Sequence, residues 1–128
     1  MTYSELTRRY FEHAACAGAA TGVDWFRGQA GSRERGTWVQ FDVQVRSAEP
    51  DGTVRAVRFL AFGCPHVIAV CQWVAEQAIG LAVDARLPES VQALRMRFEV
   101  PVEKLGRLLI VEDAWEGAMR GAVLRRNA

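Results

Sequence analysis

The clearest alternation of apolar and polar residues lies in the middle of the chain. Val39, Phe41, Val43 and Val45 are separated by single polar residues, which is the period of two expected of a strand with one buried face. A second apolar run, 54–62, follows the turn-forming residues 49–52 (EPDG). These runs predict an antiparallel hairpin that buries one face and leaves the other open to solvent.

After Phe62 the apolar period changes from two to about three and a half, which indicates a helix. Pro65 suits the first helical position and Gly80 suits the residue after the helix, so Cys64 is expected at the N-cap. The predicted apolar stripe of this helix is Val67, Ile68, Cys71, Val74, Ala75 and Ala78.

Three more helices are predicted. The spacing of Thr2 and Glu5 fits a capping box, and apolar residues recur every four positions from there until Gly18. A short helix is expected over 88–94 and a long amphipathic one over 104–126. The apolar face of the long helix consists of Leu108, Val111, Trp115, Ala118, Met119 and Ala122.

The remaining segment between the first helix and the hairpin gives weaker signals. Residues 23–27 are compatible with a strand, and the glycine-rich residues 28–36 are expected to form a loop. Because the order is helix, strands, helices, with no alternation of strand and helix, the prediction is an α+β fold. It has a small antiparallel sheet of about three strands with helices packed on one face.

Length and composition narrow the class of protein. A chain of 128 residues makes one domain, 1–128, and a net charge of +1 gives no general attraction to nucleic acid or to an anionic membrane. No apolar run is long enough to span a bilayer, so we expect a cytoplasmic protein. The three cysteines form no C-x-x-C pair and are expected to be free thiols.

Five blocks of residues carry a resemblance to a known family, and their spacing agrees with it as well. They are residues 3–5 (YSE), 59–64 (FLAFGC), 68–69 (IA), 100–105 (VPVEKL) and 112–114 (EDA). With them the chain resembles the iron–sulfur scaffold family of IscU and the NifU N-terminal domain. The resemblance implies a SufE/IscU-like fold, a part in iron–sulfur cluster assembly, and a cysteine desulfurase or another assembly protein as partner.

The resemblance also implies a metal site, in which three cysteines and a histidine or aspartate hold a cluster or zinc. Only Cys64 matches that set. Arg35 and Thr37 stand in place of the cysteine and aspartate of a C-G-D motif, and Gly106 and Arg107 replace the histidine and cysteine of K-x-H-C. One thiolate cannot complete a four-ligand site, so the isolated monomer is expected to hold no cofactor.

The family's chaperone-binding segment is altered too. Where the resemblance implies L-P-P-V-K, this chain has residues 100–104 (VPVEK), with an additional acidic residue. This change argues against chaperone binding.

Two interpretations of the replaced ligand positions stay open. Arg35 and Arg107 are expected near Cys64, where they either stabilise a thiolate that accepts a persulfide or simply fill positions that have lost their ligands. His66 is a candidate base or second metal ligand, or a solvated side chain. Cys64 is thus the metal-site candidate and, in the alternative, the sulfur acceptor.

The other thiols are weaker candidates. Cys16 and His13 lie where the family has N-P-R-N, and they are either further metal ligands or incidental. Cys71 falls on the apolar stripe of the helix that follows Cys64 and is expected in the core. Three hypotheses follow: a non-enzymatic divergent scaffold, a Cys64-dependent sulfur carrier, and a regulatory decoy that binds a desulfurase.

Overall fold

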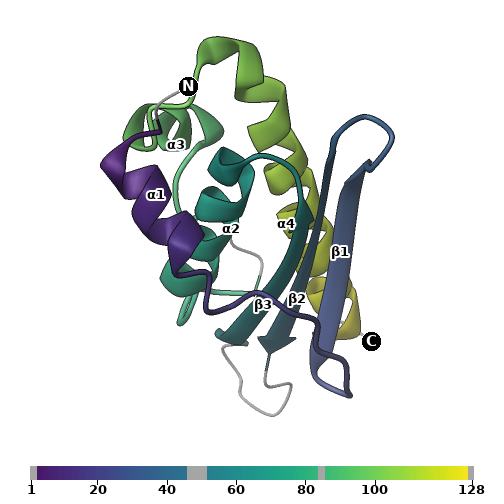
Figure 1. Ribbon diagram of the computed structural model, residues 1–128. Coiled ribbons are helices and arrows are strands. Elements are labelled where there is room, and N and C mark those ends of the chain that lie inside the picture. The colour runs from purple at the N-terminus through teal and green to yellow at the C-terminus, as the bar shows by residue number, and fades with distance from the viewer. Residues whose placement is uncertain (1–2, 46–51, 84–85, 127–128) are drawn as a thin grey trace.

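The fold is a three-stranded antiparallel sheet with order β1-β2-β3 and helices on one face (Figure 1). The computed structural model describes residues 3–45, 52–83 and 86–126. The strands are β1 (Trp25–Ser32), β2 (Thr37–Val45) and β3 (Val54–Phe62). Helices α2 (Pro65–Gln77) and α4 (Leu105–Arg126) lie against the sheet, and α1 (Glu5–Glu12) packs on α2.

The predicted alternation in β2 is confirmed. Its apolar residues are buried beneath the helices, with Phe41 opposite Gly28 on β1 and Phe59 on β3. The Phe41 ring meets Trp115 of α4 edge to face at 5.3 Å. Sheet and long helix therefore share one apolar core.

The prediction of a loop over 28–36 was wrong. Strand β1 runs through Ser32, and only residues 33–36 form the turn to β2. The glycine at 28 permits a close contact, because a Cβ there would lie 2.1 Å from the Ala114 carbonyl oxygen of α4. Gly31 has φ of +80°, which a glycine adopts without strain, and remains paired with β2.

The buried faces of the helices agree with the predicted periodicity, whereas some helix ends differ from the prediction. Cys64 is the N-cap of α2 as expected, and the predicted stripe is buried except for Ile68, which is half-buried. The apolar face predicted for α4 is buried throughout, and the 3-10 turn η1 (Val102–Lys104) leads into this helix.

Two helix boundaries differ because other side chains provide the caps. Ser4 caps α1 by accepting a hydrogen bond from the Thr7 N–H at 3.1 Å, whereas Thr2 lies outside the described residues. Helix α1 ends at Glu12 and does not continue toward Gly18. Ser90 caps α3 (Val91–Arg97), so that helix starts three residues later than predicted.

The face of the sheet opposite the helices is not fully open to solvent, contrary to the prediction. Residues 14–22, here called the crossing segment, pass from the β3 edge over β2 toward β1 (Figure 1). Gln40 and Asp42 are buried on this face, and Asp42 accepts a hydrogen bond from the Ala20 N–H of the segment. Of the predicted turn 49–52, only Gly52 lies within the described residues.

Candidate thiol site at one end of the sheet

Three segments that are distant in sequence meet at one end of the sheet (Figure 1). They are the β1–β2 turn, the junction of β3 and α2, and the start of α4. The antiparallel register explains this, because Trp38 at the beginning of β2 pairs with Phe62 at the end of β3. The Arg33 guanidinium lies over both rings, 5.5 Å from the Trp38 centroid and 6.0 Å from that of Phe62.

Cys64 is the half-buried thiol at this end. Its Sγ lies 4.0 Å from Nδ1 of His66. Burial alone would raise the pKa of the thiol, but the Val67 backbone N–H, the Arg107 guanidinium and the His66 backbone N–H favour the thiolate. Together they hold the Cys64 pKa below its ordinary value. A larger fraction of the thiol is therefore present as the nucleophilic thiolate.

His66 is not a solvated side chain, as one interpretation of the sequence had it. It is 3% exposed, and its ring meets the Tyr3 ring edge to face at 4.8 Å. Burial lowers its pKa first, and the positive charges of Lys104 and Arg107 lower it further. The imidazole is therefore neutral near pH 7, with its Nδ1 beside the Cys64 thiol.

The four positions at which the resemblance implies metal ligands lie in different surroundings. Arg107 acts directly on Cys64, whereas Arg35 is not among the groups that shift the Cys64 pKa. Arg35 lies exposed in the β1–β2 turn, and its backbone N–H donates to Ser32 Oγ. Thr37 is buried, and Gly106 is exposed, with no atom within 4 Å of where its Cβ would be.

Cys16 and His13 are not brought to Cys64. Helix α1 runs alongside α2 with the two N-terminal ends together, as the contact of Tyr3 with His66 indicates, so residues after α1 lie near the far end of α2. Cys16 accepts a hydrogen bond from Gln72, which is eight residues beyond Cys64, or about 12 Å along a helix.

His13 lies farther along α2 than Cys16, in a hollow of about 270 Å³ beside Glu76. Cys71 is fully buried as predicted, and burial raises the pKa of its thiol far above the ordinary value. Neither residue takes part in the Cys64 site.

Metal-ligating side chains do not gather at this end in the part of the chain that the structure describes. Among those residues, no group of three or more His, Cys, Asp or Glu side chains is placed to hold a metal ion. The described helices also include none with the length and apolar character needed to cross a membrane. The site is instead a thiol and a neutral imidazole beside two cations, Lys104 and Arg107.

Sequence reasoning did not find Tyr3 or Lys104 as members of the site. Lys104 Nζ lies 5.8 Å from the Tyr3 ring centroid, and the same ring packs on His66. These contacts join the N-terminus to segments more than 60 residues away, and no local pattern encodes them. The only signal was that both residues belong to the blocks that carry the family resemblance.

Comparison with known proteins decides the family. A family model described as the NifU-like N-terminal domain matches residues 2–120. This chain belongs to that family. The predicted resemblance is confirmed, and with it the assignment to a family of iron–sulfur cluster assembly scaffolds.

The name of one relative of this NifU-like domain agrees with the assignment. "Iron sulfur cluster assembly protein 2, mitochondrial" of Saccharomyces cerevisiae is 25% identical over 100 residues, which are 78% of this chain and 63% of the yeast protein. The chain therefore spans less than two thirds of that relative's length.

Solved structures confirm the predicted α+β fold class. A NifU-like protein (N-terminal) from Brucella abortus superposes with a TM-score of 0.67 at 17% identity, over 95% of this chain and 94% of that one. A putative iron–sulfur cluster assembly scaffold protein for the SUF system from Fervidobacterium islandicum gives 0.65 at 14% identity, covering 91% and 96%. At these identities the likeness establishes the fold alone.

Proposed function

We propose that this NifU-like chain takes part in iron–sulfur cluster assembly as a divergent, non-enzymatic member that does not hold a cluster through the family's three-cysteine set. The observation that supports this is the composition of the Cys64 end of the sheet. Arg107 stands beside the thiol where the family pattern has a cysteine. A guanidinium carries a permanent positive charge, so it repels a metal cation that a thiolate in its place would bind.

The proposal includes a partner and a location. A cysteine desulfurase or another assembly protein is the expected partner, and the name of the yeast relative supports a place in cluster assembly. Chaperone binding is not part of the proposal, because Glu103 adds an acidic residue to the segment concerned. We propose a cytoplasmic location, although the yeast relative is named as mitochondrial.

Anaerobic purification followed by iron and acid-labile sulfide analysis tests the main proposal. Visible absorption and a native mass should be measured on the same sample, because a dimer could combine thiols from two chains. We expect neither iron nor sulfide near cluster stoichiometry in the monomer. A monomer containing both, with iron–thiolate absorption that disappears in Cys64→Ala, would refute the proposal.

A second candidate function is a sulfur carrier, which the geometry around Cys64 favours. The thiolate would attack the outer sulfur of a donor persulfide, so that a new S–S bond forms at Cys64 while the donor's S–S bond breaks and its thiolate leaves. Arg107 lies where it would stabilise both the attacking thiolate and the persulfide anion that results.

Sulfur loading distinguishes this candidate from the main proposal. The chain is incubated with a cysteine desulfurase and cysteine, and its intact mass is measured without reductant. A carrier gains the mass of one sulfur atom, and Cys64→Ser abolishes the gain while Cys16→Ser retains it. If the chain binds the desulfurase but gains no sulfur, it acts as a decoy; if it neither binds nor gains sulfur, both candidates that involve the desulfurase are wrong.

A further inference from the structure

The two edges of the sheet are covered to different extents. At the β3 edge the crossing segment pairs with the strand, through Gly18 N–H to the Phe59 carbonyl at 2.7 Å and Phe59 N–H to the Cys16 carbonyl at 3.0 Å. At the β1 edge, residues 26–32 form no backbone hydrogen bond beyond the ladder with β2, among the residues that the structure describes. A long, uncovered edge strand is a template for another strand.

A groove of about 530 Å³ runs beside this edge, between β1 and α4. Its lining residues are Gln29, Asp113, Gly117, Arg120, Gly121 and Leu124. The helix can lie close to the strand because a Cβ at Gly117 would be only 3.3 Å from Gly28 Cα. One side of the groove is therefore the unpaired outer edge of β1. The other is a face of α4 that has glycines at its centre and a charged residue on each side of them.

Charges and apolar residues on this helix face are arranged symmetrically about Gly117. Asp113 comes four residues before it and Arg120 three residues after it. Farther out, Leu109 and Leu124 are 45% and 68% exposed, eight residues before and seven after. An identical helix laid antiparallel at this centre would therefore place each acid opposite a base and each leucine opposite a leucine.

Within one chain these charges do not satisfy each other. Seven residues separate Asp113 from Arg120, which is about 10 Å along the helix axis. In the described part of the chain, no ion pair joins either residue to another side chain.

From this self-complementarity we propose that a second copy of this chain occupies the groove. The two β1 strands pair antiparallel about a two-fold axis near Gly28, which forms one sheet with three strands from each copy. Asp113 of each copy then faces Arg120 of the other.

The pairing also sets a condition on the spacing of the two helices. Helix α4 packs over both β1 and β2, through Gly28 and Phe41 respectively. Because the α4 backbone lies against Gly28, next to the two-fold axis, the pairing requires the two copies of α4 to lie at about the usual 8–10 Å for packed helices.

The pairing has a consequence for Cys64. An antiparallel sheet formed through β1 places the two Cys64 ends at opposite ends of the dimer, because Cys64 follows the end of β3 at one end of each sheet. The dimer therefore leaves both thiol sites accessible and does not combine two copies of Cys64 in one metal site.

Sedimentation velocity over a range of concentrations, at low and high salt, tests the proposal. We expect a monomer–dimer equilibrium for the natural chain. Arg120→Glu replaces two attractive cross-dimer contacts by two repulsive ones and should raise the dimer dissociation constant at least about tenfold at low salt. The charge swap Asp113→Arg with Arg120→Glu should return the constant to within about threefold of the natural value.

Arg8→Glu is the matched control, since Arg8 is an exposed arginine on α1 and its reversal changes the net charge equally. It should leave the dissociation constant unchanged. Amide exchange of residues 26–32 should slow as the dimer forms, because their outer N–H groups become hydrogen-bonded. A chain that stays monomeric at every soluble concentration overturns the proposal. A dimer that tolerates Arg120→Glu as well as it does Arg8→Glu overturns it too, since that dimer uses another surface.

Discussion

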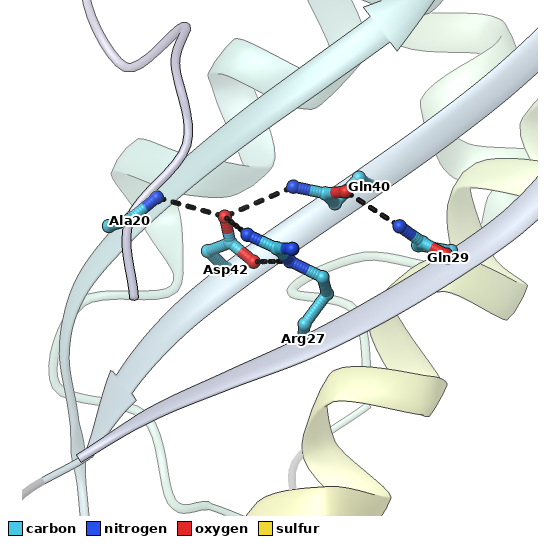
Figure 2. A network of polar contacts seen from close by, with 5 residues as sticks. All are labelled: Ala20, Arg27, Gln29, Gln40 and Asp42. Atoms are coloured by element: carbon cyan, nitrogen blue, oxygen red, sulfur yellow. Dashed lines mark hydrogen bonds and ion pairs between the residues drawn. The ribbon is translucent and has the colours of Figure 1, made fainter. Parts of the chain in front are cut away.

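Removing the Asp42 carboxylate should detach the crossing segment from the sheet. Figure 2 shows Asp42 at the centre of a polar network that links this segment to β1 and β2. Its oxygens accept from the Ala20 N–H at 3.0 Å, from the Arg27 guanidinium at 2.7 and 3.2 Å, and from Gln40 Nε2 at 3.2 Å. The carboxylate is 1% exposed, so these donors stand in for water.

The expected loss of stability in Asp42→Ala depends on whether each hydrogen-bond donor can reach water once the carboxylate is gone. Breaking a buried ion pair typically costs about 3–5 kcal/mol when the remaining charge stays buried. Arg27 is 42% exposed and can turn to solvent, which removes part of that cost. The Ala20 N–H and the Gln40 amide each lose a hydrogen-bond partner, at about 1–3 kcal/mol each at most. We expect a net loss of about 2–4 kcal/mol in the free energy of unfolding.

Urea unfolding followed by circular dichroism measures this loss, and Gln44→Ala is the matched control. Gln44 lies on the same strand and face as Asp42, is half-buried and should cost less than about 1 kcal/mol. Amide exchange of Ala20 should accelerate in Asp42→Ala at concentrations of urea where the core remains protected. If Asp42→Ala costs no more than Gln44→Ala, the network does not hold the crossing segment and the reasoning fails.

Further outcomes follow from the surroundings of four particular residues. Arg107→Gln should raise the pKa of Cys64, seen as a higher midpoint in the pH dependence of its alkylation rate, whereas an unchanged midpoint would mean that the guanidinium does not act on the thiol. Gly28→Ala should lower the free energy of unfolding by at least about 2 kcal/mol, because its Cβ meets the backbone of α4. Gly106→Ala, where the Cβ meets open space, should instead stabilise by up to about 1 kcal/mol in the same urea experiment. The unfolded chain protonates His66 near pH 6.5 and the folded chain only at lower pH, so stability should fall as pH drops below about 6.5. His66→Gln should remove that part of the pH dependence.

The apolar periodicity predicted the strands and helices that form the core. The sequence signals were misleading where a glycine is present because of a contact with a distant part of the chain. The alternation in β2 and the stripe in α4 are local consequences of burial, so a short window reveals them. Glycines at 28 and 31 read as loop signals because glycine is common in turns. The structure uses Gly28 to let α4 approach the strand, and that helix lies more than 70 residues away in sequence.

The same distinction applies to the candidate site. The position of Cys64 at the N-cap followed from Pro65 and the change of period, and Arg107 was expected near it from the family resemblance. The burial of His66 could not be predicted, because Tyr3 covers it from the other end of the sequence. Likewise, nothing adjacent to Asp42 in the sequence indicated that the crossing segment would cover it.

On the proposed function, loss of metal ligands is compatible with the NifU-like fold at the two replaced positions that lie outside the core. Arg35 and Gly106 are exposed at the end of the sheet, outside the apolar core that joins β2, α2 and α4. Exchanges at such positions cost little stability, so a sequence can lose metal ligands there and still fold as a NifU-like domain. The chemistry of the remaining site must then follow from its own charges. Arg107 lowers the pKa of the thiol, and Lys104 and Arg107 lower that of the imidazole; positive charge of this kind opposes a metal cation and favours an anionic sulfur species at Cys64.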